Sequence, residues 1–258
     1  MKWFPQTGAG SLVQLPLHRR RKWRAIANDL ENGERISLPD AAAGQIEWRL
    51  SYRDLSDAEV SKLNDLFAAC RGRFGSFGFV DPIANLLTWS EDLSHADWQT
   101  GLLSKASGAT DPMGTRRAWT VSNGSPGSQA LSQTVSVPGD YVACFSLWVR
   151  SNTPGSVILQ RDAVQSSAAV GPVWKQAFAG GAGASGAANS TVSLTLAAGH
   201  SVDVWGLQFE VQPYASQYKP TAGASRIYEE TYFGTDELIM TSTGVGLSAC
   251  ELTLVSRV

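Results

Sequence analysis

Glycine and proline interrupt this chain so often that few segments are long enough to form a helix. The sequence has 25 glycines and 11 prolines among 258 residues, and its apolar residues occur in short runs between turn residues. Nine tryptophans and nine phenylalanines lie within these short segments. Only 17% of the residues are charged, whereas coiled coils and helical bundles are rich in charged helix formers. These features predict a turn-rich protein built mainly of β-strands.

The charge balance and the cysteines exclude several classes of protein. Lys and Arg number 21 and Asp and Glu 23, so the net charge of −2 is too close to neutral for a general nucleic-acid or membrane-surface binder. Cys70, Cys144 and Cys250 are far apart and odd in number, so we expect reduced thiols in the core. No run approaches 18 apolar residues, and the N-terminus lacks a signal-peptide pattern. We therefore expect neither a membrane span nor export through a signal peptide.

One segment has a clear helical pattern. Ser56 and Glu59 have the spacing of a capping box, in which each side chain bonds the backbone N–H of the other. Apolar residues then recur at helical spacing up to a glycine that can cap the end: Val60, Leu63, Leu66, Cys70 and Gly72. The pattern predicts a helix packed on a sheet. Strands are predicted before it at 12–15 and, with strict alternation, at 45–52.

Alternating apolar residues between 84 and 222 predict a β-sandwich. The strand candidates are 130–137, 141–150, 156–161, 191–196 and 202–211, separated by Asn-Gly and Pro-Gly turns. The small residues of 179–188 predict an exposed loop. A GxGxxG pattern lies at 181–186, but a strand pattern follows it where a nucleotide site needs a helix, so we expect a loop there and no nucleotide.

The last 36 residues cannot fold alone. They offer two strands, at 237–241 and 247–257, and two strands need a sheet to join. The helix of the first region needs more strands to cover it. We therefore predict that 1–83 and 223–258 form one discontinuous β-sandwich domain with one packed helix, interrupted by a second sandwich at 84–222. Asp81-Pro82 is a turn that suits such an insertion.

The residue types needed for catalysis are not grouped. His18, His95 and His200 are solitary, without the Cys, Glu or Ser settings of metal or nucleophile motifs. The acidic doublets 91–92, 229–230 and 236–237 place their carboxylates on opposite faces of a strand, which does not make a hydrolytic pair. We expect no enzyme, no cofactor and no metal.

A basic cluster lies near the N-terminus, at Arg19, Arg20, Arg21, Lys22 and Arg24. It could grip phosphates, line a channel through which DNA passes, or pair with an acidic neighbouring subunit. With a net charge of −2 on the chain, a subunit or lumen contact is the favoured interpretation, and we expect no specific nucleic acid.

Tryptophans in the sandwich region are candidates for sugar binding, because pyranose C–H faces stack on indole rings. Trp148 and Trp205 lie inside strong strand patterns and are predicted to be core residues. Trp98 and Trp119 lie in loop-like context, and Arg116 and Arg117 nearby could bond hydroxyl groups. These four residues are the predicted carbohydrate site.

Two parts of the chain resemble phage tail proteins. The run from Arg71 to Pro82 (RGRFGSFGFVDP), after a strand with Trp48 to Tyr52 and a helix, resembles distal tail or minor tail proteins of long-tailed bacteriophages and gene transfer agents. Residues 237–244 and the terminal strand look like that family's closing strands. Residues 85–93, Trp98, 205–210 and 218–221 resemble jelly-roll modules of phage tail proteins, which are similar to carbohydrate-binding domains.

The resemblance implies a non-enzymatic virion protein of the tail tip or baseplate, assembled in the host cytoplasm. A homo-oligomeric ring, a hexamer, would join the tail tube to the baseplate hub or fibre and meet the tape-measure protein. The inserted jelly roll would face outward and bind host cell-surface polysaccharide. Two alternatives stay open: a receptor-binding or fibre protein whose main role is glycan adhesion, and a glycan-degrading enzyme with an accessory module.

Overall fold

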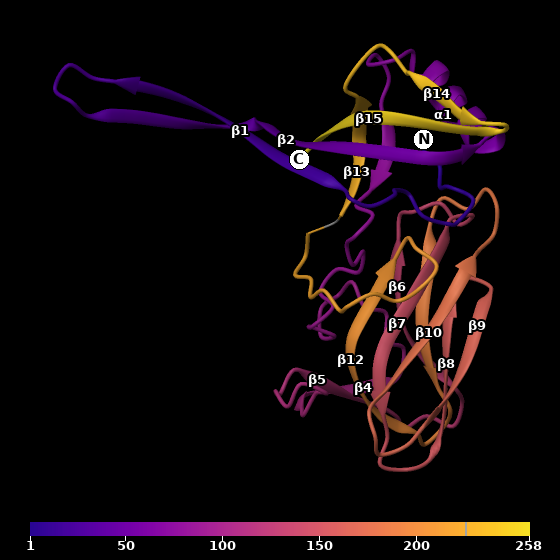
Figure 1. The fold of residues 1–258 in the computed structure, drawn as a ribbon. Coiled ribbons are helices and arrows are strands. Elements are labelled where there is room, and N and C mark those ends of the chain that lie inside the picture. The colour runs from indigo at the N-terminus through magenta and orange to yellow at the C-terminus, as the bar shows by residue number, and fades with distance from the viewer. Residues whose placement is uncertain (225) are drawn as a thin grey trace. The chain divides into compact units, whose positions relative to one another are not determined.

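The computed structural model describes residues 1–224 and 226–258, and the side chains of all of these except residues 41 and 42. The described residues form fifteen strands and one helix, so the prediction of a mainly β protein is confirmed. They divide into two compact units (Figure 1). Unit 1 comprises Met1–Gly8, Leu12–Val80 and Tyr228–Val258, and unit 2 comprises Ala9–Ser11 and Asp81–Ile227. No helix among these residues is long and apolar enough to cross a bilayer.

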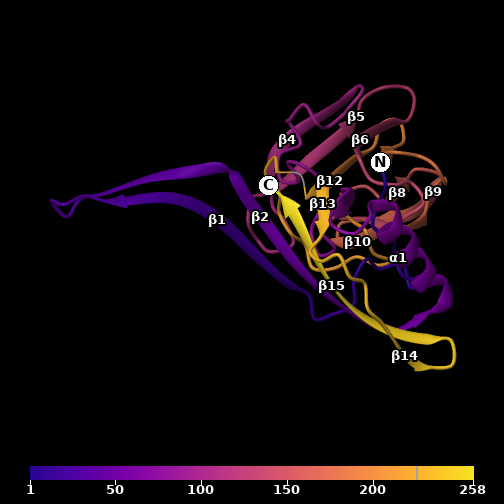
Figure 2. The same cartoon turned by 90° about the horizontal axis from the view of Figure 1, so that it is seen from above.

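Unit 1 is built on one six-stranded, mainly antiparallel sheet. Its strands are β1 (His18–Asp29), β2 (Arg35–Ser56), β3 (Phe77–Val80), β13 (Ile227–Phe233), β14 (Met240–Gly244) and β15 (Leu247–Arg257). The order is β1-β2-β15-β13-β3, with β14 also paired to β15. The register between β15 and β2 runs from Leu247 opposite Ser56 to Arg257 opposite Gln45. The last strand of the chain therefore lies in the same sheet as strands from its first 80 residues (Figure 2).

Helix α1 (Asp57–Cys70) is the predicted helix, with the predicted capping box. The Glu59 carboxylate accepts from the Ser56 N–H at 2.7 Å, and the Ser56 hydroxyl accepts from the Glu59 N–H at 3.4 Å. Leu63, Leu66 and Cys70 are buried on its inner face. The helix ends at Arg71-Gly72 as predicted, and both residues are left-handed, with φ of 54° at Arg71, the cap, and 64° at Gly72. The core beside it is aromatic: Trp48 lies 5.2 Å from Phe79, and both are fully buried.

The strand predicted at 12–15 is wrong, because side chains replace the strand pairing there. The Tyr52 hydroxyl donates to the Leu12 carbonyl at 2.6 Å. The Gln14 amide both donates to the Arg53 carbonyl and accepts from the Arg53 N–H, each at 2.8 Å. The segment is thus held against β2 without forming a ladder. The predicted strand at 45–52 lies within β2, and 247–257 is β15.

Unit 2 is a sandwich of two antiparallel sheets. One sheet has the order β10-β7-β12-β5-β4 and the other β6-β11-β8-β9. The bounds are β4 (Leu103–Ala109), β5 (Ala118–Asn123), β6 (Gln129–Val135), β7 (Val142–Arg150), β8 (Gly155–Arg161), β9 (Val164–Val170), β10 (Lys175–Ala182), β11 (Ser190–Leu196) and β12 (Ser201–Glu210). The chain repeatedly switches between the sheets in the double Greek-key order of a jelly roll. All five strands predicted between 130 and 211 are present.

Some strands of this sandwich could not be predicted from the sequence, because they consist mainly of small residues. The predicted loop at 179–188 is wrong in its first half, because β10 continues to Ala182 and pairs Gly180 with Cys144 of β7. The rest of the stretch is loop, and no helix follows the GxGxxG pattern. Strands β4, β5 and β9, rich in Ser, Ala and Thr, carry too few large apolar residues to show a period. Cys70, Cys144 and Cys250 are free and buried, as predicted.

Candidate functional site

A cavity of about 770 Å³ lies on the outer side of the five-stranded sheet of unit 2. Its lining comes from β7, β10, β12 and two loops: Pro112, Met113, Arg117, Trp148, Gln176, Trp205, Ala215, Ser216, Gln217, Tyr218 and Pro220. The volume is within the range of small-ligand sites, and a few polar groups among apolar walls are typical of them. The lining thus supplies two indole rings, a phenol ring, one guanidinium group, amides and a hydroxyl.

The floor of the cavity is a pair of tryptophans. Trp148 of β7 and Trp205 of β12 are directly opposite each other in the sheet register. Their neighbours Val149 and Val204 are fully buried, so the two indoles take the opposite, outer side of the sheet. A bulge between Trp205 and Gln208 follows, with Gly206 at a φ of 68°. The bulge lets Trp205 and Gln208 share one side of the strand.

Tyr218 forms a wall against this floor. Its ring lies 4.8 Å from the Trp205 ring in an edge-on arrangement. Its hydroxyl is 2.8 Å from the Ser90 hydroxyl, and burial raises the pKa of Tyr218 well above its ordinary value despite that bond. Thr221 fixes the same segment, since its N–H donates to Ser90 Oγ at 2.9 Å and its hydroxyl to the Leu87 carbonyl at 2.6 Å. The phenol is thus a neutral, positioned group.

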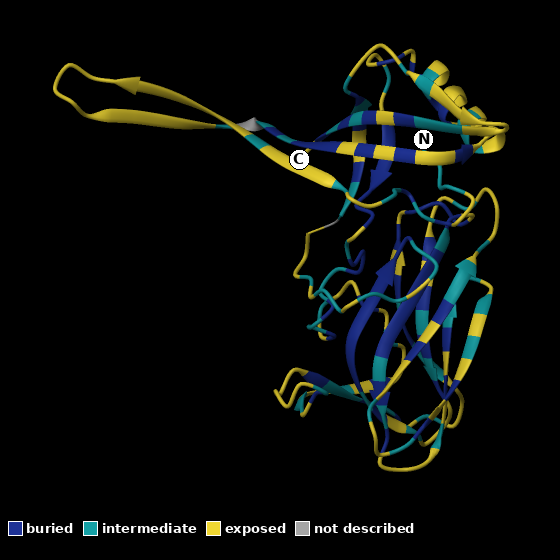
Figure 3. Ribbon diagram, in the orientation of Figure 1, coloured by how far each residue is buried: buried dark blue, intermediate teal, exposed yellow. Residues whose placement is uncertain are grey.

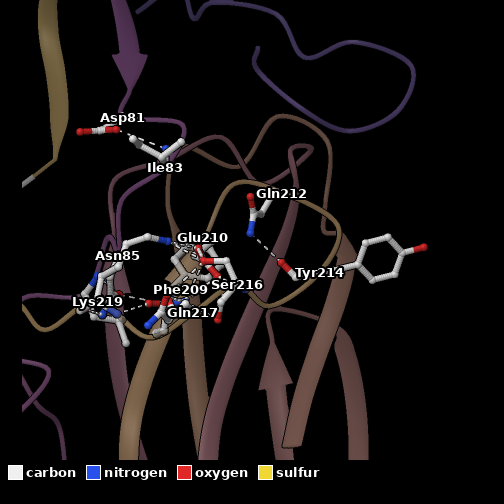
Figure 4. Close-up of polar contacts among 12 residues, drawn as sticks. Asp81, Ile83, Asn85, Phe209, Glu210, Gln212, Tyr214, Ser216, Gln217 and Lys219 are labelled. Carbon is white, nitrogen blue, oxygen red and sulfur yellow. Dashed lines mark hydrogen bonds and ion pairs between the residues drawn. The ribbon is translucent and has the colours of Figure 1, made fainter. Parts of the chain in front are cut away.

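Glu210 anchors the loop that carries Tyr218. The Glu210 side chain is 1% exposed and forms an ion pair with Lys219 at 2.9 Å. The Ser216 N–H donates to it at 2.9 Å and the Gln208 amide at 2.7 Å, as Figure 4 shows for Ser216 and Lys219. The Lys219 N–H in turn donates to the Gln208 amide oxygen at 2.8 Å. A buried carboxylate with this many donors is well compensated.

Asn85 joins the two ends of unit 2. Its amide nitrogen donates to the carbonyls of Leu207 and Lys219, each at 3.0 Å. Its amide oxygen accepts from the N–H groups of Leu87 and Phe209, each at 3.1 Å. The side chain is 2% exposed, and these four bonds use both of its polar atoms. The motifs at 85–93 and 205–221 are therefore neighbours in space.

The opposite wall is a loop organised by Asp111. The buried Asp111 carboxylate accepts from the N–H groups of Met113, Thr115 and Arg117 at 2.8, 3.1 and 3.2 Å. Burial would raise the pKa of this carboxyl, but the Thr115 hydroxyl and the three N–H groups hold it below its ordinary value. The Arg117 guanidinium, which lines the cavity, lies 3.2 Å from Glu91. This loop holds a cation at the rim.

A second, polar hollow lies on the same side of the sheet. About 510 Å³ in volume, it is lined by β12 residues Ser201 and Asp203 and by Thr120, Asn152 and His200 among others. Asp203 accepts from Arg150 Nε at 2.9 Å and from the Thr120 hydroxyl at 2.6 Å. Asp203 and Trp205 are two residues apart on β12, ~7 Å along the strand, so one strand contributes to both the hollow and the cavity.

The structure separates the four predicted carbohydrate residues. Arg117 lines the cavity. Arg116 does not line it, and its guanidinium donates to the Gly108 carbonyl at 3.1 Å. Trp98 is only 4% exposed and donates to the Trp89 carbonyl at 3.1 Å, so its prediction as a surface stacking residue is wrong. Trp119 is half-buried and donates to the Glu91 carbonyl at 2.9 Å. It is not among the residues lining the cavity.

Sequence reasoning missed Trp148, Trp205 and Tyr218. The first two were predicted to be core residues. Trp205, 9% exposed, is buried as predicted and packs against Tyr218, whereas Trp148 is half-buried at the cavity. Trp148 alternates with the buried Leu147 and Val149, a period-2 signal that places it on the other side of the strand. Nothing in the sequence indicates that Tyr218 folds over Trp205.

The predicted contact cluster Arg19, Arg20, Arg21, Lys22 and Arg24 lies on β1 in unit 1. Lys22 forms an ion pair with Glu47, and Arg24 with Asp40. The Arg19 guanidinium lies over the Trp48 ring, 5.6 Å from its centroid. The subunit or lumen contact of these residues stays a prediction.

Several solved structures are similar to about half of this chain. No family model and no curated protein matches the chain. The enzymatically active domain of bacteriophage CBA120 tailspike protein 4 is 12% identical over 51% of this chain and 22% of that one, with a TM-score of 0.39. The CBM22-1 xylan-binding domain of Paenibacillus barcinonensis Xyn10C is 14% identical over 51% and 97%, with a TM-score of 0.42. TmCBM61, in complex with β-1,4-galactotriose, is 16% identical over 49% and 97%, with a TM-score of 0.36. The similar structures thus include a phage tailspike domain and carbohydrate-binding modules.

Proposed function

We propose that unit 2 binds a glycan in the cavity over Trp148 and Trp205. The observation that carries this proposal is the pair of indole rings opposite each other on the outer side of the sheet, with Tyr218 beside them. Pyranose rings have apolar C–H faces that pack on flat aromatic rings, whereas their edges are polar. The cavity combines both surfaces.

The rim suits the hydroxyl groups of a sugar. Arg117 supplies donors, and the amides of Gln176 and Gln217 supply both donors and acceptors. Among the described residues, the buried indole N–H of Trp205 has no hydrogen-bond partner. These groups bind and orient. We therefore propose a binding role without catalysis.

The test is calorimetry of the full chain with soluble oligosaccharides selected on a glycan array. Trp148→Ala should weaken binding about tenfold or more, corresponding to about 1.4 kcal/mol. Trp23→Ala, a tryptophan 69% exposed on β1 of unit 1, is the matched control and should bind as the wild type does. No binding to any glycan, or equal losses in both variants, would refute the proposal.

We further propose that unit 1 is the distal-tail-like domain of a phage tail-tip protein, interrupted by unit 2. The supporting observation is the run 71–82, whose Phe77–Val80 forms β3 in the same sheet as the closing strand β15. In this role, copies of unit 1 form a ring, a hexamer, between tail tube and baseplate hub and next to the tape-measure protein. Weak glycan contacts of several copies then add by avidity.

A receptor-binding or fibre protein is the alternative. Its main role would be glycan adhesion, with unit 1 as the anchor. Cryo-electron microscopy of particles with antibody-labelled chain separates the two, because a ring protein encircles the tail axis and a fibre protein hangs from it. Label absent from the tail tip would refute both assignments, together with the proposed location in the virion.

A further inference from the structure

Unit 1 carries a two-stranded arm without any covering layer. Beyond the sheet, β1 and the first half of β2 run as a hairpin whose register pairs Asp29 with Arg35 and Arg24 with Asp40. Every residue from Trp23 to Pro39 is exposed (Figure 3). An isolated two-stranded hairpin is marginally stable in water. We therefore expect the arm to be stabilised by contact with another polypeptide surface.

One face of the arm carries an apolar stripe, beside Asn28 and the Arg24–Asp40 pair. Ile26 pairs with Leu38, and Ile36 lies two residues further along on the same side. These side chains are 56%, 59% and 50% exposed, respectively. The other face carries small residues, Ala25 opposite Pro39 and Ala27 opposite Ser37. A contiguous exposed apolar stripe of this kind is typical of a protein contact.

The two ends of the arm have opposite charges. The tip, residues 29–35, holds Asp29, Glu31, Glu34 and Arg35, a net charge of −2. The root, residues 18–24, holds five cations, of which Lys22 and Arg24 are paired with Glu47 and Asp40. A hollow of about 360 Å³ at the root is lined by His18, Arg19, Arg20, Glu47 and Arg49. Among the described residues, the side chains of Arg20, Arg21 and Glu31 have no ionic or hydrogen-bonding partner.

We propose that the acidic tip of one arm docks on the basic root of the arm of a second copy of this chain. The same element carries both complementary ends, so each copy can give and receive the contact, while the apolar stripe packs between the arms. This inference rests on the proposed assembly of unit 1, and it specifies the surfaces through which two copies meet. A head-to-tail contact closes a ring, whereas a mutual contact makes a pair.

Nucleic acid fits the arm less well than a second copy does. A DNA-binding arm needs positive charge along its length to neutralise phosphates. Here the tip would be repelled, because three of its seven residues are carboxylates. The apolar stripe would also stay uncovered on a phosphate surface.

The test is sedimentation of the full chain at 0.15 M salt. The tip variant is Glu31→Lys with Glu34→Lys, and the root variant is Arg20→Glu with Arg21→Glu. All four residues are exposed, so both variants should keep the wild-type circular dichroism. Each variant alone should self-associate at least tenfold more weakly than the wild type, and an equimolar mixture of the two should restore association. Lys62→Glu with Lys175→Glu, the same change of charge as in the root variant but at exposed sites elsewhere, should associate as the wild type does.

The outcomes separate this contact from the assembly itself. A monomeric wild type would refute the assembly of unit 1 and this contact with it. A wild type that associates equally well in all variants would refute only the arm contact. A monomeric wild type that binds labelled duplex DNA through the root, lost in the root variant, would assign the root to nucleic acid and overturn the proposal.

Discussion

The Lys219 ammonium lies 2.9 Å from the Glu210 carboxylate, and only one of these partners reaches water. The Glu210 side chain is 1% exposed, whereas that of Lys219 is 39% exposed. Mutation of the two residues should therefore destabilise the protein by different amounts. Removing the lysine leaves a buried negative charge, while removing the carboxylate leaves an ammonium that solvent can hydrate.

We predict that Lys219→Met destabilises unit 2 by about 3 kcal/mol, because the buried Glu210 carboxylate loses its counter-ion but keeps its hydrogen bonds from Ser216 and Gln208. Glu210→Gln should cost about 1–2 kcal/mol, because hydrogen bonds to the neutral amide replace charge-assisted ones. Urea unfolding measures both values. In the double variant, the loss should be smaller than the sum of the single losses. Equal losses in the two single variants would contradict this account.

Asn85→Ala is expected to destabilise unit 2 by about 2–4 kcal/mol, since each buried group left unsatisfied costs about 1–3 kcal/mol. The four bonds of Asn85 join backbone groups of the first and last segments of the unit. Asn189→Ala, an exposed residue between β10 and β11, is the control and should change stability by less than about 0.5 kcal/mol. Similar denaturation midpoints for the two variants would show that Asn85 is dispensable.

The lowered pKa of the Asp111 carboxyl predicts that the loop forming the cavity wall is destabilised by acid. Its pKa is lower in the folded protein than in the unfolded chain, so its stabilisation is present above the unfolded pKa of about 3.9 and is lost as the pH falls through the folded pKa. The melting temperature should fall as the pH drops below about 4, and less steeply in Asp111→Asn. Asp65→Asn makes the same charge change at an exposed carboxylate of α1 and should keep the wild-type slope. An unchanged slope in Asp111→Asn would contradict the role of this carboxylate.

The elements with a strong period could be predicted from the sequence. Helix α1 has both its capping box and its apolar stripe, and β2 and β15 alternate over long runs. Strand β1 could not be predicted, because every residue in it but Lys22 is exposed and no alternation results. Strand β1 forms because it pairs with β2 in a hairpin, and no apolar alternation within β1 indicates this pairing.

The candidate site was harder to predict than the fold. Arg117 was found because it lies near other candidate ligands, but Trp98 was misassigned, since a loop-like sequence does not show that a ring is buried. Trp148 and Trp205 come together only through the register of β7 and β12, which depends on residues 57 positions apart. Long-range register and a bulge, rather than local composition, create the cavity floor.

The bulge itself gives the last prediction. Gly206 has a φ of 68°, and a Cβ there would lie 3.3 Å from Trp148 Cδ1 and 3.4 Å from Tyr218 Cγ. Gly199 has a φ of 73°, with no atom within 4 Å of such a Cβ. Alanine at either position should cost about 1–2 kcal/mol, the backbone penalty of a left-handed residue. Only Gly206→Ala should also displace the two rings, and so weaken glycan binding in calorimetry and change the near-ultraviolet dichroism of the aromatic residues. Equal binding by the two variants would show that the spacing of these rings does not set the affinity.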